Sequence, residues 1–193
     1  MSPSPIHTPR SPTSSCKKSA DGRNRPKLLR YDIQVLPLLA ELFEHQAWAD
    51  ATMIAAVRAC PEACDDEKLL QALHHMITVQ RAFLALFVKW PLDMNAELKP
   101  PESLDALAAR FRDTHPAEVA FVKGLDDASL ERVIETPWLP GAKLTLAQAM
   151  MQVLMHSQWH RGQCATRLRA AGGQPPTLDF ILWLKDRPAP AWS

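Results

Sequence analysis

LTLAQAMMQVLMHSQWHRGQCATRLRAAG, residues 144–172, carries the strongest helical signal in the chain. Thr145 is a favourable N-cap, and Gly172 with the glycine after it ends the helix, because glycine readily adopts the left-handed conformation that follows a helix. His156 and His160 are four residues apart, so both imidazoles point from one helix face. Such a pair is a base for a metal site if another helix supplies a third ligand. Without that ligand, two histidines on a long helix are more often surface residues or hydrogen-bonded core residues.

Two further long helices are predicted in the first half of the chain from the spacing of apolar side chains. The first extends over about residues 33–58 and is closed by Pro61, which cannot continue it. The second covers about residues 66–89, with Asp65 as its N-cap. It is apolar around much of its circumference, as expected for a helix with neighbours on several sides.

A fourth long helix is predicted between these two and the histidine-rich stretch. Ser103 is its N-cap, and its apolar pattern extends to about Leu125. Pro116 lacks a backbone N–H and should kink or split the helix near Thr114. His115 precedes this proline on a polar stretch, so we expect it to be exposed to solvent.

Residues 130–142 differ from the helices on either side. Val133, Ile134 and Thr136 are followed by Pro140 and Gly141, a pattern that predicts a short extended excursion or hairpin. A last short apolar segment covers residues 180–185. Four long helices with short connections predict an all-α fold, an up-down four-helix bundle with this excursion before the last long helix.

Residues 1–26 contain five prolines and six serines and have almost no large apolar side chains. Such a segment cannot bury enough surface to offset its ordering entropy, so we predict a disordered tail and a single bundle domain over residues 27–193. The tail holds five of the basic residues and one acid. Because the whole chain has a formal charge of +1, the predicted domain is mildly acidic, which argues against a nucleic-acid-binding face.

No secretory signal and no apolar stretch long enough to span a membrane is evident in the sequence. We therefore expect a cytoplasmic protein with reduced thiols. Cys60 and Cys64 lack the two-residue spacing of redox or zinc-knuckle pairs, so we interpret both as structural or incidental.

Three segments together resemble the DinB-like family of proposed metalloenzymes, which includes the YfiT-type proteins. They are FEHQAWAD at residues 43–50, LHHM at residues 73–76 with QRAFL at residues 80–84, and HSQWHRGQ at residues 156–163. The last is the most specific. The resemblance implies a four-helix bundle, commonly a homodimer, that holds a divalent metal, usually nickel or zinc, with three histidines.

Carried over to this sequence, the implied metal ligands are His75, His156 and His160. His75 matches better than His74, because the family's histidine is followed by an apolar residue, as Met76 is here. His74 is then a solvated neighbour. Characterised relatives act on low-molecular-weight thiols, which implies a small thiol and a small electrophile as substrates.

Two positions near the implied site leave alternatives open. His45 stands where the family more often has tyrosine, and it either joins the site as a fourth ligand or general base, or forms a hydrogen bond in the core. Cys164 follows His160 by four residues and either adds a thiolate ligand or is a small buried apolar residue.

Several polar residues are candidates for supporting the ligands or the substrate. Each ligating imidazole should donate its second N–H to an acceptor, for which Gln163, Glu44 and Asp50 are candidates. Arg161 and Arg169 either bind a carboxylate of the substrate or are solvated helix arginines. Trp192, in a proline-rich terminal segment, is expected to be loose.

Three functions follow from these patterns. The first is a metal-dependent thiol transferase or related enzyme, with three imidazoles and one open coordination position. The second is a non-catalytic metal-binding bundle associated with stress, in which His45 or Cys164 closes the site. The third is a metal-free structural dimer whose histidines form hydrogen bonds in the core.

Overall fold

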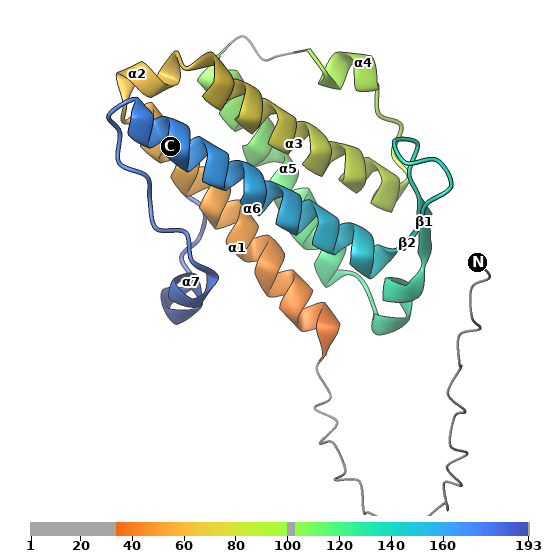
Figure 1. Ribbon diagram of the computed structural model, residues 1–193. Helices are drawn as coiled ribbons and strands as arrows, with labels where there is room; N and C mark the ends of the chain where they lie inside the picture. Colours follow the sequence, from red (N-terminus) through yellow and green to blue (C-terminus); the bar gives the residue numbers. More distant parts are fainter. Residues whose placement is uncertain (1–33, 100–102, 193) are drawn as a thin grey trace, which may run out of the picture. The chain divides into compact units, whose positions relative to one another are not determined.

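A computed structural model describes residues 34–99 and 103–192, and this part of the chain is mainly helical (Figure 1). The tail predicted at residues 1–26 lies outside it. The elements, in chain order, are α1 (Val35–Arg58), α2 (Pro61–Cys64), α3 (Glu67–Val88), α4 (Met94–Glu97), α5 (Leu104–Lys123), a 3₁₀ turn η1 (Asp127–Glu131), β1 (Val133–Glu135), β2 (Lys143–Thr145), α6 (Leu146–Ala170) and α7 (Phe180–Asp186). The four long helices therefore lie close to their predicted positions.

Side-chain caps start the long helices α3, α5 and α6. Thr145 forms a reciprocal capping box with Gln148 at α6, and Ser103 accepts a hydrogen bond at the start of α5, as predicted. At α3 the predicted cap was wrong by one residue: Asp66, not Asp65, accepts a 2.9 Å bond from the Leu69 amide. The Asp66 carboxylate also pairs with an arginine of α6.

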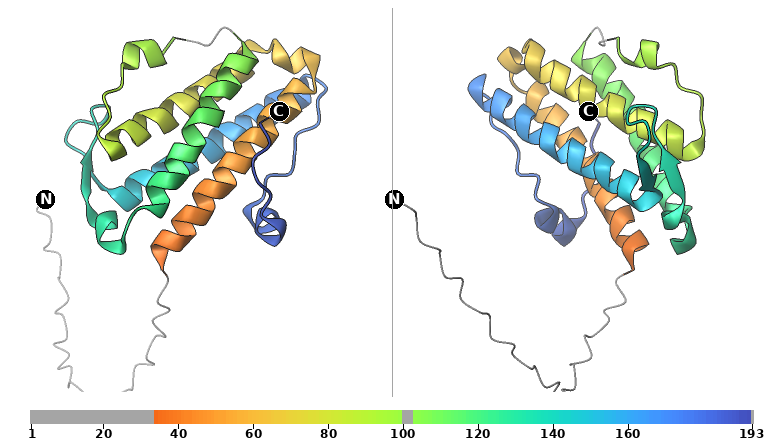
Figure 2. Two further views of the ribbon diagram at one scale, coloured as in Figure 1. Left: turned by 180° about the vertical axis from the view of Figure 1, so that it is seen from behind. Right: turned by 45° about the vertical axis from the view of Figure 1, so that its right-hand side comes forward.

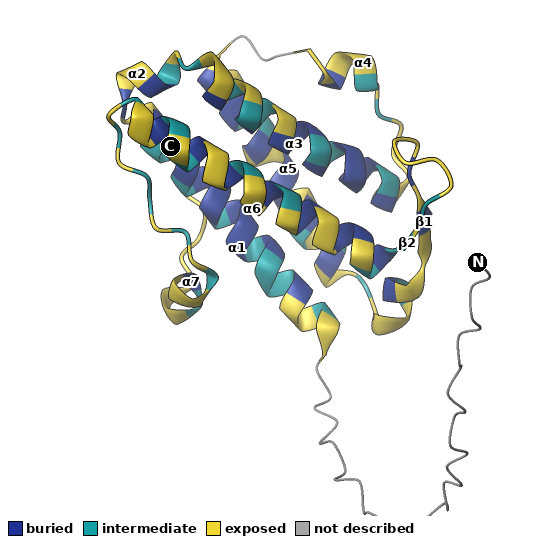
Figure 3. Cartoon of the chain, viewed as in Figure 1, coloured by how far each residue is buried: buried dark blue, intermediate teal, exposed yellow. Residues whose placement is uncertain are grey.

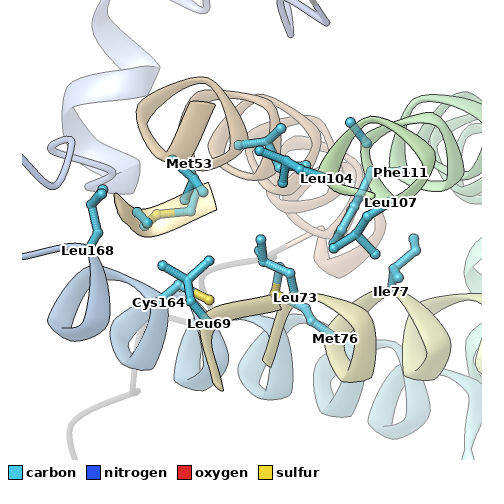
Figure 4. Close-up of a cluster of buried hydrophobic side chains, with 14 of the residues drawn as sticks. Met53, Leu69, Leu73, Met76, Ile77, Leu104, Leu107, Phe111, Cys164 and Leu168 are labelled. Carbon is cyan, nitrogen blue, oxygen red and sulfur yellow. The ribbon is translucent and has the colours of Figure 1, made fainter. Parts of the chain in front are cut away.

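Within the described residues, the hydrophobic core consists of two clusters, one at each end of the long helices. One cluster takes residues from the end of α1, the start of α3, the start of α5 and the end of α6 (Figure 4). The other takes residues from the opposite end of each helix. Helices α3 and α5 therefore run in one direction, and α1 and α6 run in the other (Figure 2).

This order of directions differs from the simple alternation expected of an up-down bundle. A connection of residues 89–103 separates α3 from α5. Fully extended, a chain of this length reaches about 50 Å, whereas the 22 residues of α3 span about 33 Å. The connection, which includes α4, is thus long enough to return the chain to the end where α3 began.

The predicted extended excursion is a short antiparallel hairpin of β1 and β2. Ile134 pairs with Leu144, and Ile134 is buried in the second core cluster. The hairpin lies beside the C-terminal end of α3, and Glu97 at the end of α4 contacts His74, Thr78 and Arg81 in the middle of α3.

Helix α5 continues through Pro116, so the predicted split near Thr114 is wrong. Buried side chains on both sides of the proline, Thr114, His115 and Glu118, form hydrogen bonds within the fold. These contacts fix both halves of the helix, which offsets the single backbone hydrogen bond that proline removes.

The segment after α6 packs back onto the helices. The Trp183 side chain of α7 is buried, and Trp192 packs against the first core cluster and stacks on His115 at a ring distance of 5.5 Å. The expectation that Trp192 is loose was wrong, because its aromatic surface covers an apolar edge of the core. No helix within residues 34–99 and 103–192 is long and apolar enough to span a membrane.

Candidate metal centre

Three histidines from two helices converge on one point. His75 comes from α3, and His156 and His160 come from successive turns of α6. The Nε2 atom of His156 lies 3.1 Å from that of His75 and 3.2 Å from that of His160. Among the described residues, these three form the group of His, Cys, Asp or Glu side chains that could hold one metal ion. Their ligand atoms all lie within 4.8 Å of one another. The structure thus brings together the three residues that the sequence predicted as ligands.

The nitrogen spacing suits a small divalent ion. Tetrahedral zinc, with Zn–N bonds of about 2.0–2.1 Å, holds two ligand nitrogens roughly 3.3 Å apart. The two measured Nε2 separations are close to that value. The donor set, three imidazoles and no carboxylate or thiolate, matches that of open zinc sites and also suits nickel.

The protonation of the cluster also favours metal binding. Burial, together with the neighbouring His160 and His75, lowers the pKa of His156 to about 4. Burial is the main cause that lowers the pKa of His75, and the nearby imidazoles of His160 and His74 lower it further. Both imidazoles are therefore neutral near pH 7, the form that binds a metal without first losing a proton.

Gln163 supports one of the three imidazoles. Its Oε1 lies 3.0 Å from Nδ1 of His160, so Nδ1 carries the proton and Nε2 presents its lone pair to the centre. Gln163 was one of three predicted supporting residues. The other two contact different partners: Glu44 pairs with Lys123, and Asp50 lies in a buried network. The Nδ1 atom of His156 is buried and lacks a partner among the described residues.

His74 is not the solvated neighbour that the sequence suggested. Its Nε2 donates a 2.9 Å hydrogen bond to the Glu97 carbonyl at the end of α4. The Glu97 carboxylate is held in turn by Arg81, through two hydrogen bonds of 2.9 Å. His74 thus fixes α4 beside α3, while the adjacent His75 points to α6.

His45 and Cys164 lie apart from the cluster. The His45 Nε2 donates a 2.9 Å bond to the Leu178 carbonyl, and its ring packs between Trp48, Phe180 and Trp183. Cys164 is fully buried among the leucines of the first core cluster (Figure 4), and burial raises the pKa of its thiol to about 12. Cys164 is therefore a core residue. Of the two roles considered for His45, the structure shows the hydrogen bond within the fold.

A buried polar network crosses all four long helices beside the candidate centre. The Asp50 carboxylate accepts hydrogen bonds from Arg161 at 2.6 Å, Gln80 at 2.9 Å and His115 at 3.1 Å. Gln80 also donates to the Ser157 hydroxyl, next to His156 in the chain. The network therefore joins the helix that carries His156 and His160 to α1, α3 and α5.

Two predictions about this network were wrong. Arg161 is buried and paired with Asp50, so it is not a solvated arginine. His115 is buried and donates from Nδ1 to Glu118 at 3.0 Å as well as from Nε2 to Asp50. The hydrogen bonds and charges of these two carboxylates outweigh the effect of burial and raise the pKa of His115 to about 9. A charged imidazole between two acids is stable inside the fold, whereas its sequence neighbours alone suggested solvent.

A pocket of about 550 Å³ opens beside the three histidines. His75 and His156 belong to its wall, and the rest comes from α3, α4, the hairpin and the first half of α6. The candidate centre is therefore accessible from a cavity large enough for a small organic molecule.

Fold and site define a helical protein with a candidate three-histidine metal centre. The sequence profile of the DinB family matches residues 35–188, a range that includes every helix of the described structure. The chain belongs to the DinB family. Among solved structures it is similar to a DinB-like protein from Bacillus cereus ATCC 10987, with 17% identity and a TM-score of 0.56 over 69% of this chain and 90% of that chain. That likeness concerns the fold. No curated protein matches this chain.

Proposed function

We propose that this protein is a divalent-metal-dependent enzyme of the DinB family, with His75, His156 and His160 as the ligands of nickel or zinc. The observation that carries the proposal is the convergence of three Nε2 atoms, separated by 3.1 and 3.2 Å, next to an accessible pocket. Among the described residues no fourth protein ligand joins the group, so a water or a substrate atom would complete the coordination.

The histidines and their neighbours would do three things in such an enzyme. Their imidazoles would hold the ion, and Gln163 would keep His160 in the tautomer that presents Nε2. A divalent ion there would lower the pKa of a bound water or thiol toward neutrality. The buried network around Asp50 would keep α6 in register with the other helices.

The reaction that we propose is transfer of a low-molecular-weight thiol to a small electrophile. With 1-chloro-2,4-dinitrobenzene as the test electrophile, the sulfur bonds to the ring carbon, chloride leaves, and the thiol proton passes to solvent. Several thiols should be screened with zinc-loaded and nickel-loaded protein. Formation of the thioether above the uncatalysed rate, lost with EDTA and in His160→Ala, supports the proposal. Full activity of His160→Ala would contradict it.

A non-catalytic metal-binding protein is the alternative from another class. That function predicts a site closed by four protein ligands, whereas His45 and Cys164 make other contacts. We therefore favour the enzyme. His45 remains a predicted catalytic residue only if the hydrogen bond to Leu178 is exchanged for one to substrate.

We further propose that the protein forms a homodimer through the outer face of α6 and the adjoining α7. The outer face of α6 carries many exposed positions (Figure 3). Met155 and Trp159 of α6 are 66% and 69% exposed, and together with Phe180 of α7 they line an apolar hollow of about 640 Å³. Large apolar side chains gathered on one face are typical of a protein interface. A cytoplasmic location stays a prediction of the sequence.

A further inference from the structure

The pocket beside the three histidines has walls of a consistent kind. Its apolar residues are Val79, Ala82 and Phe83 of α3, Met94 of α4, Leu98, Trp138 and Leu139 of the turns, and Leu144 of β2. Two threonines, two glutamines and the two histidines supply its polar groups. Among the described residues that line it, none is Lys, Arg, Asp or Glu.

This lining discriminates by charge. A carboxylate or phosphate inside the pocket would lose hydration and find no cationic side chain to pair with among the described lining residues, and an unpaired buried charge is costly. A neutral molecule would lose much less hydration free energy on entering the pocket. The pocket therefore disfavours an ion and accepts an uncharged group.

The far wall suits an aromatic or similarly flat group. The rings of Phe83 and Trp138 lie 5.5 Å apart at an interplanar angle of 45°. Phe83 is buried in the core, whereas Trp138 is 44% exposed on the hairpin turn, so a ring that enters can contact the face of Trp138.

Three of the six polar residues lie in one row on α6 that ends at His156. Gln148, Gln152 and His156 follow one another at intervals of four residues on α6, so they share a helix face. Gln148 is engaged in the capping box of α6. Gln152 is exposed and offers an amide donor and acceptor one turn before His156. A carbonyl or nitro oxygen on the bound molecule can accept from that amide.

We propose that this pocket binds the uncharged, apolar part of the electrophilic substrate, preferably an aromatic group with one hydrogen-bond acceptor. This inference rests on the proposed function, because that function makes the bound molecule a substrate. Binding itself can be measured without any reaction.

The test is a pair of probes with nearly the same shape, neutral 4-nitroacetophenone and anionic 4-nitrobenzoate. Their affinities for the full-length, metal-free protein at pH 7.5 should be measured by calorimetry. We expect the ketone to bind at least tenfold more tightly. Equal binding of the two, or tighter binding of the anion, would overturn the proposal.

Two variants locate the binding. Trp138→Ala should weaken the ketone at least tenfold, while Trp90→Ala, which removes a tryptophan that is exposed outside the pocket, should leave it unchanged. Gln152→Arg places a cation in the wall at an exposed helix position and should raise the affinity for 4-nitrobenzoate at least tenfold. An unchanged ketone affinity in Trp138→Ala, or no gain of anion binding in Gln152→Arg, would contradict the assignment.

Zinc binding by the same protein samples separates this inference from the proposed function. Ketone binding without zinc binding would retain the pocket and remove the metal-dependent function. Zinc binding without ketone binding would retain the metal centre and overturn the inference about the pocket.

Discussion

His115 makes a large contribution to the pH dependence of stability. Its pKa is about 9 in the folded protein and 6.5 as an ordinary histidine, and this difference corresponds to roughly 3 kcal/mol. Because the folded-state pKa is the higher one, this stabilisation is complete below about pH 6.5 and is lost as the pH rises through about 9.

Urea unfolding at pH 6 and at pH 9.5 measures this contribution. We expect the free energy of unfolding of the wild type to fall between these pH values by more than that of His115→Gln. Other groups that titrate at high pH, such as the Cys164 thiol, contribute equally to both proteins. Their contribution therefore cancels when the change in the free energy of unfolding of the variant is subtracted from that of the wild type. Parallel pH profiles of wild type and variant would show that His115 is not charged in the fold.

Arg161 should be important for stability although it lies on a helix rich in other arginines. Arg161→Leu removes a cation that pairs with the buried Asp50 carboxylate. Because a buried charge that loses its partner is costly, the substitution should destabilise the protein by about 3 kcal/mol. Arg169→Leu, at an exposed position two turns later, should change the free energy of unfolding by about 0.5 kcal/mol or less. Similar losses in the two variants, measured by urea unfolding, would argue against the buried network.

Individual residues were predictable where a local spacing determines their neighbours. His156 and His160 must share a face in any helix, and Gln163 falls within reach of His160 for the same reason. His115 and Arg161 were not predictable, because their burial depends on Asp50, which is 65 and 111 positions away in sequence. No local pattern encodes a contact between three helices.

At the scale of the elements, the caps determine where the long helices begin. Thr145→Ala breaks the capping box with Gln148 and should lower the free energy of unfolding by about 1 kcal/mol. Thr166→Ala is the matched control, since it removes an exposed hydroxyl from the same helix, far from its N-terminus. Equal effects of the two substitutions in urea unfolding would mean that the cap is not needed.

The boundaries of the long helices could be predicted within about two residues, since apolar periodicity and capping residues are local signals. Pro116 does not split α5, because hydrogen bonds of Thr114 to Arg81, of His115 to Asp50 and of Glu118 to Gln46 hold the helix on both sides of the proline. Asp65 and Asp66 are both good caps, and the arginine on α6 that pairs with Asp66 distinguishes them.

At the scale of the molecule, the direction of α5 relative to α3 was the part of the fold that the sequence did not reveal. The connection of residues 89–103 is long enough either to turn back at once or to cross the length of the bundle. The contacts of Glu97 with His74, Arg81 and Arg110 hold the connection in its crossing path. These contacts also place α4 where it forms one wall of the pocket.

The proposed dimer is tested by a charge on its predicted interface. Trp159→Glu should convert the dimer to a monomer in sedimentation velocity, because an unpaired carboxylate in an apolar interface is costly. Trp90→Glu is the control, an exposed tryptophan just beyond the end of α3. A wild type that sediments as a monomer, or a Trp159→Glu variant that remains dimeric, would contradict this interface.

The central claim is that His75, His156 and His160 hold one divalent ion, and the metal content of the purified protein tests it most directly. Untagged protein and its variants should be incubated with zinc or nickel, freed of excess by gel filtration, and measured by mass spectrometry of the elements. We predict about one ion per chain in the wild type and in His74→Ala, whose imidazole faces α4, and almost none in His75→Ala or His156→Ala. Stoichiometric metal in either ligand variant, or none in the wild type, would contradict the account.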